Sequence, residues 1–273
     1  MEQTSQQQPQ ELAQADAYYV EEGQGRFRST IHAQGAWNEH EQHMAPASGI
    51  MAHCLSRHEP REGMRIARIG FEILGVIPGG QFEVVTSTIR PGRTIELIQA
   101  ELIAGGRTAI RATAWRLITS DTSEVAATEE ASIPSREEST TWRASDVWPG
   151  GFIRSIEGFQ APGHRSGHGL GWIRPTLPLV EGQDSPDWVR LMGVVDASNG
   201  IATRVAPGDG AWIFPNVDLQ IHLFREPEGE WLGLENFVSF GTDGIGLTSS
   251  ILHDDRGAFG RAEQTLTLRK VGA

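Results

Sequence analysis

The alternation of apolar and polar residues predicts four long strands in the first half of the chain. Four segments rich in β-branched residues are separated by turns that contain Gly or Pro: residues 65–77, 81–90, 94–104 and 108–118. Apolar and polar positions alternate along the last two segments, which is typical of a sheet with one packed and one solvated face. The pattern therefore predicts an antiparallel meander joined by hairpin turns.

The residues before this meander have helical rather than alternating periodicity. Pro46 suits a helix start, and Pro60 ends the pattern. Between them, four apolar residues recur at helical spacing: Ile50, Met51, Cys54 and Leu55. The first half is therefore predicted to contain one helix, preceded by an extended segment over 26–37.

The second half repeats this order of elements. After a strand around 171–174, an apolar helix is predicted over about 187–204, where Asp187 can cap the start. Four strands are predicted to follow it: residues 212–224, 230–240, 245–253 and 258–269. Each half is thus a helix followed by a meander.

Residue identities also recur between the halves, at a spacing of 150 positions. The pairs are Ala47 and Ala197, Ser48 and Ser198, Ala52 and Ala202, Ile95 and Ile245, Leu97 and Leu247, Leu102 and Leu252, Arg111 and Arg261, and Ala112 and Ala262. This period exceeds that of ordinary solenoids, so it predicts two similar modules. A lone apolar helix needs a concave apolar face around it. We therefore predict an α+β fold in which two bent antiparallel sheets, each wrapped around a helix, pair edge to edge.

Composition sets the expected boundaries of the modules. Residues 1–16 are Gln-rich, without a basic start or an apolar stretch, and are predicted to be a disordered tail rather than a signal peptide. The first module is expected over 17–120 and the second over 150–273. Ser, Thr, Glu and Asp dominate 121–149 with little periodicity, which indicates a linker.

Charge and cysteine content exclude several classes of protein. The net charge of -12 argues against a nucleic-acid partner, since phosphate binding needs a basic stripe that this chain lacks. The single cysteine, Cys54, excludes an intramolecular disulfide and fits a reducing compartment. No segment has the roughly 20 consecutive apolar residues of a membrane helix. We expect a cytoplasmic protein without a membrane span.

Motifs of several other enzyme classes are absent from the sequence. Neither a Gly-x-Ser-x-Gly elbow nor a Gly-x-x-x-x-Gly-Lys loop occurs. His164 and His168 have the spacing of a metal-binding pair, but their Gly-rich surroundings argue against a helix. We therefore predict no metal and no cofactor. His222 and His253 lie on predicted strands without an evident partner and are assigned no role.

Four stretches, spread over residues 17–270, resemble the acyl-CoA thioesterase II family of double-hotdog proteins, of the actinobacterial type. They are Arg90-Pro-Gly-Arg-Thr with Gly105-Gly-Arg-Thr, Val194-Val-Asp-Ala-Ser-Asn, Asn216-Val-Asp-Leu-Gln-Ile-His-Leu-Phe-Arg leading to Glu230-Trp-Leu, and Ala262-Glu-Gln-Thr-Leu-Thr-Leu-Arg. The resemblance implies a double hotdog, with two helix-plus-sheet repeats forming one continuous curved sheet. It also implies hydrolysis of a fatty or related acyl thioester of CoA or a carrier. Members often associate further, so a homo-oligomer is compatible with it.

The resemblance assigns catalytic roles to three residues of the second half. Asp196 matches the family's aspartate, Gln264 its glutamine, and Asn216 the position that usually carries a hydroxyl. Asp196 would activate the water, and the amide oxygens of the other two would orient it. A backbone N–H near a helix terminus would polarise the thioester oxygen.

The first half has no equivalent trio, because the matching positions hold Pro46, Ile66 and Ala114. It is therefore expected to be scaffold and tunnel wall. His43 and His53 could approach a ligand, but a surface or core role is favoured for both. The alternative roles for Asp196 and Gln264 are a helix cap and a solvated strand residue. For Trp188 and Trp212, the alternatives are an acyl channel and ordinary packing, and packing is favoured.

Two other functions compete with hydrolysis. The amide of Asn216 at a hydroxyl position motivates a catalytically weakened acyl-CoA or lipid-binding protein. A hotdog dehydratase or hydratase would need a histidine partnered with an acid on the hotdog helix. Asp196 has no histidine within a turn or two in the sequence, which argues against that reaction.

Overall fold

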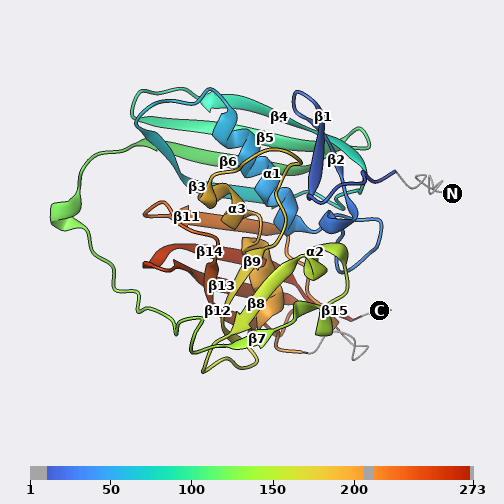
Figure 1. The fold of residues 1–273 in the computed structure, drawn as a ribbon, viewed down its shortest axis with the longest axis vertical. Helices are drawn as coiled ribbons and strands as arrows, with labels where there is room; N and C mark the ends of the chain where they lie inside the picture. The colour runs from blue at the N-terminus through green and yellow to red at the C-terminus, as the bar shows by residue number, and fades with distance from the viewer. Residues whose placement is uncertain (1–10, 206–211, 271–273) are drawn as a thin grey trace.

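The main structural element of the protein is a single curved antiparallel sheet of 13 strands. The computed structural model describes residues 11–205 and 212–270 (Figure 1). The first half of the chain supplies β1 (Tyr19–Gly23), β2 (Arg26–Ser29), β3 (Met64–Ile73), β4 (Gln81–Arg90), β5 (Ile95–Ala104) and β6 (Arg107–Ile118). The second half supplies β7 (Thr140–Trp142), β8 (Ile156–Gln160), β9 (His168–Pro175), β11 (Asp218–Leu223), β12 (Leu232–Phe240), β13 (Ile245–Asp254) and β14 (Gly257–Thr267). A separate two-stranded sheet pairs β10 (Trp212–Ile213) with β15 (Arg269–Lys270).

The two halves meet at the middle of the sheet. The strand order is β1-β2-β4-β5-β6-β3-β11-β14-β13-β12-β9-β8-β7. Strands β3 and β11 are antiparallel neighbours, with Gly70 opposite Gln220. This edge-to-edge pairing covers an edge strand of each half. It confirms the predicted α+β double hotdog with one continuous sheet.

The internal repeat is visible in the strand register. In the first half Leu102 pairs with Ile110, and in the second half Leu252 pairs with Gly260, so both members of the pair are shifted by 150. A register irregularity follows directly after Leu102 in β5 and after Leu252 in β13. The two meanders are therefore structural copies at the spacing predicted from the sequence.

The helices of the two halves differ, although both lie on the same face of the sheet (Figure 1). Helix α1 (Met44–Arg57) is continuous, as predicted. The predicted second helix over 187–204 is instead broken into α3 (Asp187–Met192), the 3-10 turn η4 (Val195–Ala197) and α4 (Ser198–Ile201). The expectation of one continuous helix was wrong.

A close helix crossing explains where the break occurs. A Cβ atom built on Gly49 of α1 would lie 2.8 Å from the Cα of Gly193, just after α3. The Ser48 hydroxyl donates to the Met192 carbonyl oxygen at 2.8 Å. The carbonyl at the end of α3 thus accepts a hydrogen bond from a side chain of the other half. The contact forms where two helices cross, and the periodicity of either helix alone does not predict it.

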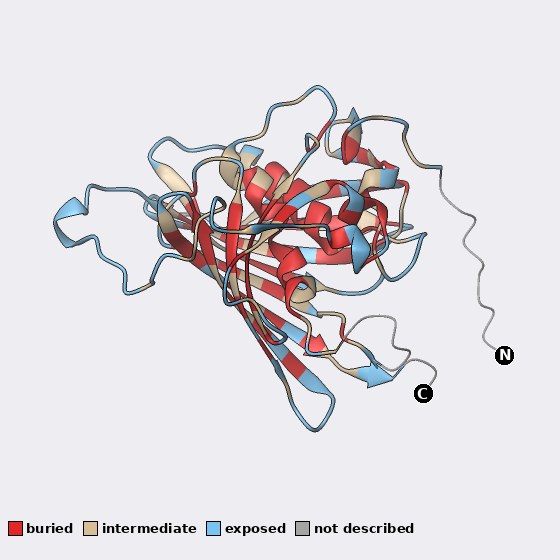
Figure 2. Cartoon of the chain, turned by 60° about the horizontal axis from the view of Figure 1, so that its bottom comes forward, coloured by how far each residue is buried: buried red, intermediate tan, exposed pale blue. Residues whose placement is uncertain are grey.

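The core lies between these helices and the concave face of the sheet (Figure 2). Along β5, buried positions alternate with more exposed ones, so one face packs on the helices. Helix α1 contacts β4, β5, α3 and η4. The remaining short helices are η1 (Ile31–Ala33), η2 (Ser123–Val125), η3 (Ala144–Asp146) and α2 (Gly151–Arg154). None of the helices within the described ranges is long and apolar enough to cross a membrane.

Three parts of the chain differ from the predicted elements. The predicted strand 212–224 is split into β10 and β11 around Pro215, which has no N–H to donate to a strand ladder. Strands β1, β7 and β8 were not predicted, because they are short and lack a clear alternation. Of the predicted tail, residues 1–10 lie outside the described residues, and Ala13 forms an isolated bridge with Thr30.

Candidate active site

A buried carboxylate lies where the helix of the second half is broken. Asp196 belongs to η4 and is only 5% exposed. Its Oδ1 accepts a hydrogen bond from Asn216 Nδ2 at 2.8 Å and another from Gln264 Nε2 at 2.9 Å. The fold therefore brings together the three residues selected from the sequence, which lie 20 and 68 positions apart.

Two segments of the sheet position the amide side chains. Gln264 lies on β14 opposite Thr248 and is fully buried, which excludes the solvated role weighed for it. The pair one repeat earlier is Ala114 opposite Ile98, two apolar residues. Asn216 precedes β11 and forms an isolated bridge with Leu266. The carboxylate and its two amide donors thus all come from the second copy.

The amide of Gln264 is oriented opposite to the expectation. Its Nε2 faces Asp196, and its Oε1 accepts a hydrogen bond from the Ser198 hydroxyl at 2.7 Å. A carboxylate can only accept hydrogen bonds, so a neighbouring amide must turn its nitrogen toward it. The structure thus gives the Gln264 oxygen the Ser198 hydroxyl as a partner, whereas the sequence led us to expect a water molecule there.

Further buried polar groups hold α4 beside Asp196. Asn236 Nδ2 donates to the Ser198 carbonyl at 3.0 Å, and Asn199 Nδ2 donates to the Phe214 carbonyl at 3.0 Å. Asn236 and Ser198 are fully buried, so the hydrogen bond between them is shielded from water, whereas Asn199 is half-buried. They fix the short helix, and with it the backbone on which Asp196 lies.

The first half contributes a histidine to the same carboxylate. His43 directly precedes α1, and its Nδ1 accepts a hydrogen bond from the Ala45 N–H at 3.0 Å. The same Nδ1 lies 3.4 Å from Asp196 Oδ2. A surface or core role was expected for His43, whereas the structure places it against Asp196. The available signal was an acceptor side chain at the start of the predicted helix, but the packing of that start on Asp196 is a tertiary contact.

Burial sets the protonation of this pair. It lowers the pKa of His43 to about 4, so the imidazole is neutral at neutral pH. It raises the pKa of Asp196 to about 6, and the hydrogen bonds from Asn216 and Gln264 offset part of that rise. A carboxyl group whose pKa lies this close to neutral pH can both accept and return a proton.

A cavity of about 730 Å³ opens onto Asp196 and His43. Both halves line it, and most of its wall is apolar or aromatic. Trp37, Trp148 and Phe214 meet edge to face there, with ring centroids 5.2 to 5.9 Å apart. Trp188 instead lines a separate cavity of about 290 Å³, and Trp212 contacts Lys270. The aromatic wall is thus made of residues other than the two considered from the sequence.

The other histidines considered lie elsewhere. His164 Nδ1 accepts a hydrogen bond from the Leu170 N–H, and His168 Nε2 lies 3.2 Å from Glu235 Oε1. Within residues 11–205 and 212–270, no three His, Cys, Asp or Glu side chains are grouped to hold a metal ion. His53 is a buried residue of α1.

Family models match both halves of the chain. A model of the acyl-CoA thioesterase N-terminal domain matches residues 33–117, and one of the acyl-CoA thioesterase C-terminal domain matches residues 129–268. The chain belongs to the acyl-CoA thioesterase family. It is a thioester hydrolase of that family, which confirms the resemblance found in the four stretches of sequence.

Solved structures show the same fold at low identity. An acyl-CoA thioesterase II from Mycobacterium marinum is 13% identical with a TM-score of 0.64, covering 93% of this chain and 96% of its own. A hot dog fold protein from Alicyclobacillus acidocaldarius is 12% identical with a TM-score of 0.73, covering 93% and 97%. A dehydratase domain of the Curacin polyketide synthase is 13% identical with a TM-score of 0.50, covering 94% and 100%. No curated protein matches the sequence.

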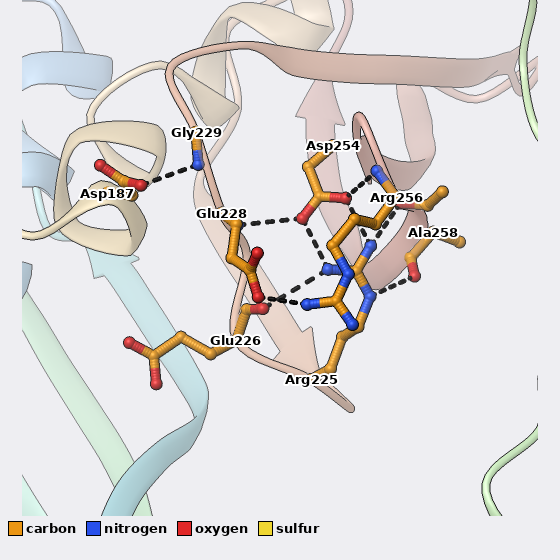
Figure 3. A network of polar contacts seen from close by, with 9 residues as sticks. Asp187, Arg225, Glu226, Glu228, Gly229, Asp254, Arg256 and Ala258 are labelled. Carbon is orange, nitrogen blue, oxygen red and sulfur yellow. Dashed lines mark hydrogen bonds and ion pairs between the residues drawn. The ribbon is translucent and has the colours of Figure 1, made fainter.

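In this thioesterase a polar network holds the start of α3, the helix that leads to Asp196 (Figure 3). Both terminal nitrogens of Arg225 donate to the buried Asp254 carboxylate at 2.6 Å. Asp254 also accepts from the Glu228 N–H at 2.9 Å, and the next residue, Gly229, donates to Asp187 Oδ2 at 2.7 Å. The loop after β11 is thereby tied to the β13–β14 hairpin and to the first residue of α3.

Proposed function

We propose that this acyl-CoA thioesterase hydrolyses acyl thioesters with a water molecule activated by Asp196. The observation that carries the proposal is the asymmetry of the carboxylate. Asn216 and Gln264 both donate to Oδ1, which leaves Oδ2 for a water molecule from the cavity. Two amides therefore hold the base in place without occupying the oxygen that would take the proton.

In this reaction one proton moves from water to Asp196 and then from Asp196 to the leaving thiolate. Asp196 Oδ2 takes a proton from water while the water oxygen attacks the thioester carbonyl carbon. The carbon–sulfur bond of the tetrahedral intermediate then breaks, and the leaving thiolate takes the proton from Asp196. The products are the free acid and the thiol, and Asp196 returns to its ionised form.

The start of α1 suits the negative charge that develops on the thioester oxygen. Met44 is the first residue of α1 and lines the cavity together with His43. The first N–H groups of a helix have no partner within the helix, and the helix dipole favours negative charge there. We therefore assign the thioester oxygen to the Met44 N–H, opposite Asp196.

The cavity suits the acyl part of the substrate better than its polar part. Its wall carries three indole rings, of Trp37, Trp142 and Trp148, and few charged groups. Arg269 also lines it and, next to Lys270, is exposed to solvent. We assign the acyl chain to the aromatic wall and the phosphates of CoA to these two cations.

Thiol release from a panel of acyl-CoA substrates tests hydrolysis directly. Asp196→Asn is expected to lower kcat by about 100-fold or more, since it removes the general base. Asn216→Thr, which restores a hydroxyl donor, is expected to remain active. Tight acyl-CoA binding without turnover by the unmodified protein would instead favour the weakened, lipid-binding alternative.

One contact favours a second candidate function, the dehydration of a 3-hydroxyacyl thioester. This reaction needs a histidine beside the acid, and no histidine lies within a turn or two of Asp196 in the sequence. His43 supplies it from the other half, with its Nδ1 3.4 Å from Asp196 Oδ2. The His43 Nε2 would remove the proton from the carbon next to the carbonyl, and Asp196 would protonate the departing hydroxyl. A 3-hydroxyacyl-CoA substrate separates the two reactions, because dehydration forms an enoyl thioester without releasing thiol.

A further inference from the structure

The contact between His43 and Asp196 joins two hydrogen-bond acceptors. Because the Ala45 N–H donates to Nδ1 at 3.0 Å, Nδ1 carries no proton and presents its lone pair. Asp196 Oδ2 lies 3.4 Å from that nitrogen. With Asp196 ionised, a negatively charged oxygen faces a lone pair without a proton between them, which is unfavourable.

Protonation of Asp196 removes this conflict. A proton on Oδ2 can be donated to Nδ1, which then shares its lone pair between the Ala45 N–H and the Asp196 O–H. The imidazole therefore stabilises the protonated carboxyl group and not the ionised one. This is the opposite of the effect of Asn216 and Gln264, whose nitrogens donate to Oδ1 and stabilise the ionised form.

We propose that His43 is a positioning residue for the hydrolytic reaction. Once Asp196 has taken a proton from water, its O–H donates a hydrogen bond to His43 Nδ1. The inference rests on the proposed function of Asp196. The second half supplies the base and its hydrogen-bond donors. The first half supplies His43, which makes that base strong enough to take a proton.

The surroundings of His43 hold the ring in this orientation. The His43 N–H donates to the Ala33 carbonyl at 2.8 Å, and the imidazole packs on Phe152 with centroids 4.4 Å apart. The preceding residue, Gln42, accepts from the Tyr19 hydroxyl and donates to the Pro78 carbonyl. The imidazole is therefore fixed by both its backbone and its neighbours.

Other charged groups approach Asp196 from the neighbouring segments. Glu41, before α1, and Arg269, on β15, line the same cavity. On β11, the carboxylate of Asp218 is bound to the Thr265 N–H and its carbonyl to Asn216. None of these three side chains has an ion pair or hydrogen bond with the Asp196 carboxylate in the described structure. His43 is the titratable group in direct contact with it.

The test is the pH dependence of kcat for His43→Asn, with acyl-CoA as substrate. Asparagine is a good helix N-cap, so α1 keeps its start, while its amide can donate to Asp196 Oδ2. The acid limb of the profile is expected to move to lower pH by about one unit, and kcat at pH 7 to fall about tenfold or more. His40→Asn, three residues earlier and exposed, is the matched control and should leave the profile unchanged. If His43→Asn does not fold, His43→Ser provides the same cap without an imidazole.

A second measurement does not depend on turnover. In protein labelled with ¹⁵N-histidine, the His43 Nδ1 resonance is expected to shift as Asp196 titrates, and this step should vanish in Asp196→Asn. An unchanged acid limb in His43→Asn, or an Nδ1 resonance that ignores Asp196, would overturn the proposal while leaving hydrolysis intact. If the unmodified protein releases no thiol, the proposed function fails, and the Nδ1 titration alone decides whether the pair shares a proton.

Discussion

Asp196→Asn should make the protein more stable at neutral and alkaline pH while removing its activity. The carboxyl group is almost fully buried, and its pKa rises from 3.8 to about 6 on folding, chiefly because burial disfavours the ionised form. A difference of about 2 units, at about 1.4 kcal/mol each, corresponds to about 3 kcal/mol. The folded protein bears that cost whenever Asp196 is ionised.

The sign follows from proton linkage. The folded state binds the proton more tightly than the unfolded state, so the favourable contribution is fully present below the unfolded pKa of 3.8. It is lost as the pH rises through the folded value of about 6. An asparagine is neutral throughout, keeps an oxygen for the donors Asn216 and Gln264, and can donate its N–H to His43. The stability of the variant relative to the unmodified protein should therefore increase by about 2.5 kcal/mol between pH 4 and pH 8, because part of the contribution is already lost at pH 4.

Urea unfolding followed by tryptophan fluorescence, repeated across this pH range, measures the difference. Asp184→Asn, at an exposed loop position, is the matched control and should show no such pH-dependent gain. A difference between Asp196→Asn and the unmodified protein that stays constant from pH 4 to pH 8 would contradict this prediction. It would mean that folding does not raise the pKa of this carboxyl group.

Three further predictions test the parts that support the site. Gln264→Ala removes a hydrogen-bond donor from Asp196, so the acid limb of the pH profile of kcat should move to higher pH, opposite to the shift in His43→Asn. The value of kcat should fall by about tenfold at most. Arg225→Met leaves Asp254 buried without its partner and should cost about 3–5 kcal/mol in urea unfolding at neutral pH. Burial alone would raise the pKa of Asp254, but its hydrogen bonds, led by those from Arg225, outweigh burial and lower it. The cost should therefore shrink as the pH falls through the pKa. Gly49→Ala places a Cβ 2.8 Å from the Gly193 Cα and should cost about 1–3 kcal/mol, seen as a lower Tm.

The strands were predictable because the alternation of residues along each strand follows from which of its faces is buried. A strand with one packed face must alternate, and β4 was predicted with the bounds that it has in the structure, 81–90. The 150-residue repeat was predictable for the same reason, since Leu102 and Leu252 face equivalent surroundings. Short strands such as β7 carry too few residues to show a period.

The repeat, the strand-rich meander and three polar residues of the second half could be predicted from the residues alone. Three features depend on how the elements pack: Asp196 lies at a break in its helix, Gln264 turns its nitrogen toward it, and His43 of the other half contacts it. Periodicity along one element shows whether a side chain is buried, because burial follows the local geometry of that element. Which buried group faces which depends on how two elements cross, and the crossing near Gly49 and Gly193 joins residues 144 positions apart, as the Ser48 to Met192 hydrogen bond beside it does.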